Sequence, residues 1–220
     1  MDEEEIRATS GAVKEDSVSQ AVFLLSPAHC GGKRGRILLR EEADFPLAVQ
    51  LRALGAPIGE VFSFLSGLYF RGKLTYGRAF SRPGAAPSGV LVITPGRGLL
   101  PPETVVTHEE LRAIAEIGVT PEEPRFREPL ARDSAALASA LSPRDRVILL
   151  GSIATGKYVD ILEGHLSGRL RFPSAFVGRG DMSRGGLMLR CVLEQRELEY
   201  IPIAGAVRRG PRPPKLERIR

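Results

Sequence analysis

The sequence predicts an α/β fold, a three-layer α/β/α sandwich with a mostly parallel central sheet. Three continuous apolar runs indicate strands that are buried on both faces, as the strands of parallel sheets are; they are residues 21–25, 90–94 and 146–150. Helical patterns lie between these runs, so strands alternate with helices along the chain. The chain has 220 residues, of which 43% are hydrophobic, and this is enough for one globular domain.

In the first half of the chain, strand 21–25 ends at Ser26-Pro27, and residues 36–40 are a second possible strand. Regularly spaced apolar residues favour a helix over 45–54. The longest helical pattern covers 61–80 and is interrupted near Gly67. Strand 90–94 leads into a loop over 96–102. A helix over 108–117 then follows, with acidic residues in its first turn, where the helix dipole favours them.

In the second half, the prolines within 118–131 indicate an irregular loop, and Asp133 is the expected cap of an alanine-rich helix that ends at Leu141. Strand 146–150 precedes a helix. The later elements follow from shorter patterns; they are helix 157–166, an edge-like strand 169–172, a glycine-rich loop 178–186, a helix or strand over 187–193, and a final strand 199–203.

The ends of the chain differ from its middle in composition. We expect a disordered acidic leader over 1–19, a single α/β domain over 20–207, and a basic, proline-rich tail over 208–220. No apolar run is long enough to span a bilayer, and the acidic start is unlike a secretory signal. The two cysteines, Cys30 and Cys191, suit reduced thiols and exclude a cysteine-rich zinc site. We therefore expect a cytoplasmic protein without a membrane partner; the sequence leaves its oligomeric state open.

The formal net charge of +5 and a pI near 9.5 suit a polyanionic partner. Nucleic acid is the expected partner, DNA rather than RNA. An arginine-coated surface without such a partner explains the same charge equally well.

Conspicuous polar residues follow the predicted strands, where ligands of open α/β sheets bind. The expected catalytic residues are Asp181 and His29. The expected substrate-binding residues are Lys33, Tyr69, Tyr76, Arg97, Ser152, Lys157, Tyr158, Arg179 and Arg184. No metal or other cofactor is required by this interpretation.

The segment from Gly151 to Lys157 has the spacing of a phosphate-binding loop, G-x-x-x-x-G-K, between a strand and a helix. Nucleotide hydrolases need a hydroxyl for Mg²⁺ after the lysine, and Tyr158 stands there. Two interpretations remain open. A helix N-terminus and Lys157 bind a phosphate without cleaving it, or the segment is a glycine turn before a surface lysine.

The predicted loop 178–186 holds Asp181 between Arg179 and Arg184. Two arginines can hold a carboxylate ionised, and such a group can activate water or stabilise a developing cation. An exposed turn with a surface salt bridge is the alternative. The four glycines of this segment indicate that its backbone approaches something closely.

The segment 68–80 alternates aromatic and basic residues. Arg71, Lys73 and Arg78 are candidates for phosphate contacts, and Tyr69 or Tyr76 for stacking on a base. An amphipathic helix with its aromatic residues in the core explains the same pattern.

A wider pattern resembles a known family. It consists of Lys33, the segment Leu68-Tyr69-Phe70-Arg71 with Tyr76, the segment 94–102, Gly151 with Tyr158, and Phe172-Pro173 before Gly178. Over residues 20–190 this is similar to a bacterial domain family related to the peroxide-stress protein YaaA. That family in turn remotely resembles the uracil-DNA glycosylase superfamily and the base-handling domains of archaeosine synthesis.

The resemblance implies an α/β/α sandwich that handles a nucleobase or a nucleic acid. The acid-Pro-Tyr motif with which glycosylases activate water is replaced here by Ser26-Pro27-Ala28-His29, and no helix-hairpin-helix is evident. Asp181 or His29 must then supply the charge.

The leading hypothesis is a nucleic-acid base-processing enzyme, an N-glycosidase that acts on a modified or damaged base flipped into the pocket. The alternative is a non-enzymatic DNA- or nucleotide-binding protein that uses the same basic loops. A nucleotide hydrolase is a third possibility, which Tyr158 disfavours.

Overall fold

The structure, a computed structural model, describes residues 19–84, 86 and 88–216. Its main sheet has six strands in the order β4-β3-β1-β6-β7-β8. The inner four are parallel, and an antiparallel strand closes each edge. In chain order the strands are β1 (Ala21–Leu25), β3 (Val90–Thr94), β4 (Gly98–Leu100), β6 (Arg146–Leu150), β7 (Leu170–Pro173) and β8 (Tyr200–Pro202).

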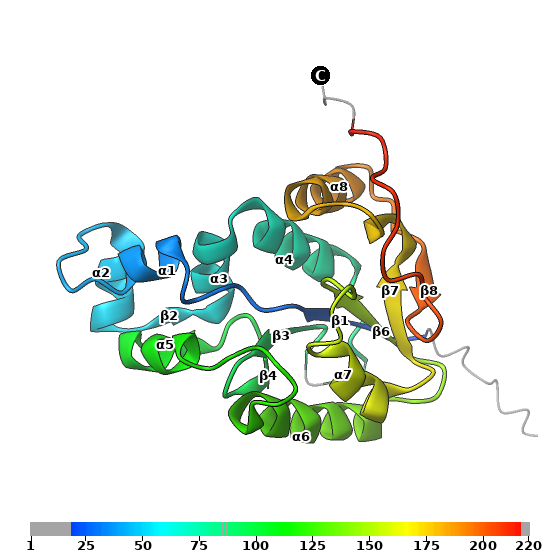
Figure 1. The fold of residues 1–220 in the computed structure, drawn as a ribbon, viewed down its shortest axis with the longest axis horizontal. Helices are drawn as coiled ribbons and strands as arrows, with labels where there is room; N and C mark the ends of the chain where they lie inside the picture. Colours follow the sequence, from blue (N-terminus) through cyan, green and yellow to red (C-terminus); the bar gives the residue numbers. More distant parts are fainter. Residues whose placement is uncertain (1–18, 85, 87, 217–220) are drawn as a thin grey trace, which may run out of the picture.

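Helices cover both faces of this sheet, which confirms the three-layer α/β/α sandwich (Figure 1). One face carries α3 (Ile58–Ser66), α4 (Leu68–Phe80) and α8 (Asp181–Leu193). The other carries α6 (Pro124–Ala140) and α7 (Val159–Leu166). At the left end of Figure 1 lie α1 (Lys33–Leu38), α2 (Pro46–Ala53), α5 (His108–Ala115) and the two-stranded sheet of β2 (Ala56–Pro57) and β5 (Val105–Val106).

The three apolar runs form the centre of the sheet, as the sequence predicts. Strand β1 lies between β3 and β6, and all its side chains are buried. A strand flanked on both sides and covered on both faces has no polar environment, which explains its unbroken apolar sequence. The carboxyl ends of β1, β3 and β6 therefore meet at one edge of the sheet.

The crossing of α4 and α8 depends on two glycines. A Cβ at Gly72 would lie 2.8 Å from the carbonyl oxygen of Gly185, and a Cβ at Gly185 would lie 2.7 Å from that of Leu68. The predicted glycine-rich loop 178–186 is therefore wrong in its second half, because α8 begins at Asp181. The close approach that its glycines indicate is made in part to another helix.

Other predicted elements are also wrong. Residues 36–40 form no strand, since α1 ends at Leu38. Helix α6 begins at Pro124, a residue type that suits the first turn of a helix, and Pro129 lies inside it. Asp133 is consequently mid-helix and accepts a hydrogen bond from the Leu99 N–H (2.9 Å) instead of capping.

Two further differences concern the sheet. The loop predicted over 96–102 contains β4, which forms a tight hairpin with β3. Gly96 and Gly98 adopt φ of 77° and 73° there, in the region that favours glycine. Strand β7 is internal and not at an edge, because β8 pairs with it.

The predicted leader lies almost wholly outside the described residues. In the predicted tail, residues 208–216 are described and form neither helix nor strand. Arg208 lies 3.6 Å from Asp160, and the Arg179 guanidinium donates to the carbonyl oxygen of Pro214 (3.4 Å), so this segment contacts the domain. Among the described residues, no helix has the length and apolarity needed to cross a membrane.

Candidate functional site

A cavity of about 640 Å³ opens at the carboxyl ends of β1, β3 and β6. Its volume lies within the range typical of small-molecule sites. Six of the eleven predicted site residues line it; they are His29, Tyr69, Ser152, Lys157, Tyr158 and Asp181. The residues that follow β1 and β6 thus converge on one site, together with side chains from α4 and α8.

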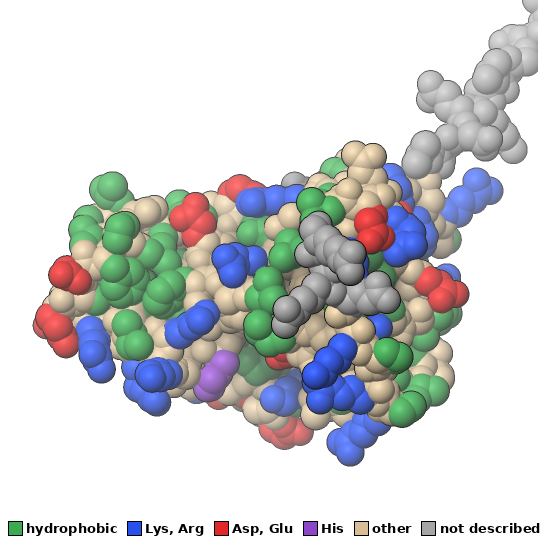
Figure 2. Space-filling model, turned by 90° about the horizontal axis from the view of Figure 1, so that it is seen from above, with side chains coloured by type: hydrophobic (Ala, Val, Ile, Leu, Met, Phe, Trp, Pro, Cys, Tyr) green, Lys and Arg blue, Asp and Glu red, His purple; other side chains and the backbone are tan. Residues whose placement is uncertain are grey.

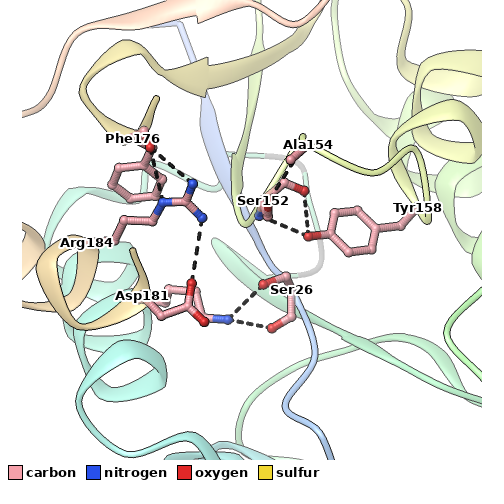
Figure 3. Close-up of polar contacts among 8 residues, drawn as sticks. Ser26, Ser152, Ala154, Tyr158, Phe176, Asp181 and Arg184 are labelled. Carbon is pink, nitrogen blue, oxygen red and sulfur yellow. Dashed lines mark hydrogen bonds and ion pairs between the residues drawn. The ribbon is translucent and has the colours of Figure 1, made fainter. Parts of the chain in front are cut away.

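Hydrogen bonds between Tyr158 and Ser152 hold the segment after β6 in a turn. The Tyr158 hydroxyl accepts a hydrogen bond from the Ser152 N–H (3.0 Å) and donates one to the Ser152 carbonyl (2.9 Å), as Figure 3 shows. Burial raises the pKa of Tyr158. A Cβ at Gly151 would lie 2.8 Å from both the Tyr158 hydroxyl and the Ser26 Cβ. The loop therefore holds an aromatic ring where a nucleotide hydrolase has a Mg²⁺-binding hydroxyl, and Lys157 remains exposed at the cavity.

Lys73 lies behind the cavity wall and is 1% exposed. Its ammonium donates to the Ser26 carbonyl (2.6 Å) and to the Ser26 Oγ (2.9 Å). The ring centroids of Tyr69 and Phe70 lie 4.6 and 4.7 Å from the Lys73 Nζ. Burial lowers the pKa of Lys73 to about 7. Ser26 itself lines the cavity, so one hydroxyl connects this buried amine to the site.

From the sequence, Lys73 is a candidate for a phosphate contact, and Ser26 is named only as the start of the loop after the first strand, without a role in the site. A signal for the buried position of Lys73 was available. It follows Tyr69 by four residues and precedes Tyr76 by three, and both tyrosines are buried. Residues at these spacings share one helix face, so the lysine lies on the stripe that packs against the sheet.

Asp181 is one of two carboxylates that line the cavity, the other being the exposed Glu116. Asp181 lies in the first turn of α8, where the helix dipole stabilises negative charge. The Arg184 guanidinium lies 3.7 Å from the Asp181 carboxylate (Figure 3). The Arg184 side chain is 10% exposed and the Asp181 side chain is 68% exposed. Arg184 also donates twice to the Phe176 carbonyl, at 3.2 and 3.1 Å. A fixed cation thus backs a carboxylate that still reaches solvent and the cavity.

The Tyr69 hydroxyl forms no hydrogen bond of normal geometry among the described residues, although Tyr69 is only 6% exposed and the Arg184 guanidinium is close to it. Burial raises the pKa of Tyr69, and the nearby Arg184 guanidinium partly opposes this effect. Buried hydroxyls in proteins are normally hydrogen-bonded. Because Tyr69 lines the cavity, its hydroxyl is suited to receive a polar group of a ligand.

Five predicted site residues do not line the cavity. Lys33 is exposed at the start of α1. Tyr76 is in the core, where its hydroxyl bonds with that of Tyr200 (2.6 Å). Arg97 is paired with Glu110. Arg179 donates to the Ala175 carbonyl (3.0 Å) and Arg184 to Phe176.

The three arginines among the expected substrate-binding residues, Arg97, Arg179 and Arg184, lie outside the cavity lining. Each is bonded to a carbonyl or a carboxylate of the chain itself. Lys157 is the remaining predicted cation that lines the cavity.

Metal ligation and thiol chemistry have little support in the site. Within residues 19–84, 86 and 88–216, no group of three or more His, Cys, Asp or Glu side chains could hold a metal ion. Burial raises the pKa of the Cys30 thiol to about 12, which keeps it protonated and unreactive.

The face of the molecule drawn in Figure 2 carries basic side chains without a continuous basic stripe. In the view of Figure 2, Lys and Arg side chains are spread over the face among polar and acidic ones. Hydrophobic side chains gather at the left end of this face, where Figure 1 shows α2. This face suits a compact ligand better than a long nucleic-acid track.

Comparisons with known proteins gave no match: no family model, no curated protein and no solved structure is similar enough to this chain to be reported.

Proposed function

We propose that the protein is an N-glycosidase that cleaves the bond between a nucleobase and its sugar. The observation that carries this proposal is Asp181, a cavity carboxylate backed by the Arg184 guanidinium at 3.7 Å. Glycosidic cleavage develops positive charge on the sugar, and a fixed carboxylate stabilises that charge. The substrate is a nucleoside unit, either free or flipped out of a strand.

Asp181 acts on the sugar side of the scissile bond. Its carboxylate stabilises the oxocarbenium-like transition state and accepts a proton from the attacking water. The cavity volume of about 640 Å³ accommodates one nucleoside unit rather than a duplex. Tyr69 contributes an aromatic face and its unbonded hydroxyl to the base.

A nucleotide- or DNA-binding protein without catalysis is the second candidate. It is favoured by Lys157, which is exposed at the cavity mouth close to the start of α7. A lysine beside a helix N-terminus attracts a phosphate. This candidate predicts salt-sensitive binding without any product.

The test is release of free bases from modified and unmodified nucleosides, DNA and RNA, detected by mass spectrometry. Asp181→Asn should lower the rate of base release at least about 100-fold while substrate binding persists. Asp44→Asn removes another exposed carboxylate, in the loop before α2, and should leave the rate unchanged. Salt-sensitive binding with no base released from any substrate would support the binding protein instead.

A further inference from the structure

The proposed function leaves one buried polar contact, that between Lys73 and Ser26, without a role. Among the described residues, Lys73 forms no ion pair with a carboxylate. Its polar contacts are the carbonyl and hydroxyl oxygens of Ser26. A buried ammonium without a counter-ion is costly, and a simple anchor for the β1–α1 loop would not require one. The position of this amine therefore calls for a functional explanation.

Ser26 is placed to pass a proton from Lys73 into the cavity. It follows β1 directly, at the carboxyl edge of the central strand, and it lines the cavity. A hydroxyl has one donor hydrogen and two acceptor lone pairs. Because Lys73 donates to the Ser26 Oγ, the hydroxyl hydrogen of Ser26 points to another acceptor. Among the described residues that acceptor is the Tyr158 hydroxyl, which a bound base would replace.

We propose that Ser26 protonates the departing nucleobase and that Lys73, a positioning residue behind it, replaces the proton that Ser26 gives up. This inference rests on the proposed function and assigns the acid side of the same reaction. Asp181 serves the sugar, and Ser26 serves the base.

The bond between the sugar carbon and the base nitrogen breaks, and its electron pair stays on the base. The base takes the Ser26 hydroxyl proton, while the Lys73 ammonium gives a proton to the Ser26 oxygen and becomes a neutral amine. Water forms the new carbon–oxygen bond and loses its proton to Asp181. The net reaction adds water across the glycosidic bond, and exchange with solvent returns the proton from Asp181 to Lys73.

The surroundings of Lys73 suit this role. Burial brings its pKa to about 7, where an amine can lose and regain a proton near neutral pH. Two charged groups from α8 act on it: Asp181 raises its pKa and Arg184 lowers it. From α4 and the segment after β6, Tyr69 and Tyr158 add phenols whose own pKa values are raised by burial, so both stay neutral in this range.

The experiment compares the wild type with Lys73→Met and Ser26→Ala, using the base that the release assay identifies. Methionine fills the same space without a proton to give. Each variant should lose at least about 100-fold in kcat. The wild-type rate should fall as pH rises through about 7, and Lys73→Met should lose that dependence. Lys215→Met, in the described part of the tail, is the matched control and should keep both the rate and the pH profile.

A second readout separates proton donation from structural support. An analogue of the same base with an electron-withdrawing substituent leaves without needing a proton. The loss in Lys73→Met should shrink toward the wild-type rate with this analogue. An equal loss on both substrates, or an unchanged pH profile in Lys73→Met, would overturn the inference. Failure of the wild type to release any base would instead overturn the proposed function.

Discussion

The cavity has two unlike walls. The polar wall presents side chains from the segments after β1 and β6 and from α4 and α8, namely Ser26, Tyr69, Tyr158 and Asp181, and the cations Lys73 and Arg184 lie behind it. The α5 wall, residues 114–119, is mostly apolar, and the pair Arg97–Glu110 near it is more than one-third exposed on each side chain. The two cations of the polar wall, Lys73 and Arg184, are buried, whereas Asp181 and both members of the pair near the α5 wall are exposed to water. Both regions shift pKa values, but by different causes. At the polar wall, burial lowers the pKa of Lys73 and raises that of Tyr158, whereas near the α5 wall hydrogen bonds from Thr107 and Arg97 lower the pKa of Glu110.

The largest effect on the free energy of unfolding should come from the titration of Lys73. Below about pH 7 this lysine is charged in both the folded and unfolded states, so the folded state bears the full penalty of burying it. Between its folded pKa of about 7 and its ordinary value of 10.5, only the unfolded state holds the proton, and stability rises with pH. From pH 7 to 9 the free energy of unfolding should gain at most about 3 kcal/mol.

Urea unfolding at several pH values checks this prediction. Lys73→Met should be more stable than the wild type at pH 7 and should lose the rise toward pH 9. Measurements stop at pH 9, the ordinary value for a thiol, because the raised pKa of buried Cys30 reduces stability above it. A rise of the same size in Lys73→Met would show that another group is responsible.

The glycine crossing between α4 and α8 should give the next largest effect. Gly185→Ala places a Cβ against the backbone of Leu68, so we expect a loss of about 2 kcal/mol in the free energy of unfolding. Gly164→Ala is the matched control, since no atom lies within 4 Å of a Cβ there and alanine favours α7. It should stabilise the protein slightly. Thermal unfolding of both variants measures these changes in stability. Equal stability of the two variants would contradict the close contact between α4 and α8.

Tyr69→Phe should have a smaller effect of opposite sign. Removing a buried hydroxyl without a partner relieves a desolvation penalty, and the free protein should gain about 1 kcal/mol. The same change should weaken ligand binding about 10-fold, as measured by calorimetry. A destabilised variant would mean that the hydroxyl is bonded in solution.

Arg97→Met should have the smallest effect. Both side chains of its pair with Glu110 are more than one-third exposed, so water and salt screen the attraction. We expect less than about 1 kcal/mol of destabilisation, vanishing at high salt. A loss of stability as large as that of Gly185→Ala would mean that the Arg97–Glu110 pair contributes to stability despite its exposure.

The same contrast explains what the sequence could predict. Unbroken apolar runs identify β1, β3 and β6 because a doubly covered strand tolerates nothing else. Their order along the chain then predicts that the segments after β1 and β6 meet. Tyr158, which follows β6, was found in this way, and Asp181 was found in the glycine-rich segment after the next strand along the chain.

The remaining site residues depend on packing that local patterns do not contain. Arg97 and Arg179 look like phosphate ligands until their tertiary partners, Glu110 and Ala175, are known. Lys73 looks solvated because lysine usually is. The glycines of 178–186 suggest a ligand loop, and Gly185 is explained only by Gly72 and Leu68, more than a hundred positions earlier.

The crossing of α4 and α8 also has a consequence for synthesis on the ribosome. Lys73 and its contact Ser26 emerge early, whereas α8, which covers this region, is made more than a hundred residues later. Asp181 and Arg184, which α8 contributes to the cavity and its surroundings, are likewise absent until then. The candidate site is therefore completed late, so a nascent chain truncated before α8 should have a sheet centre without a complete cavity.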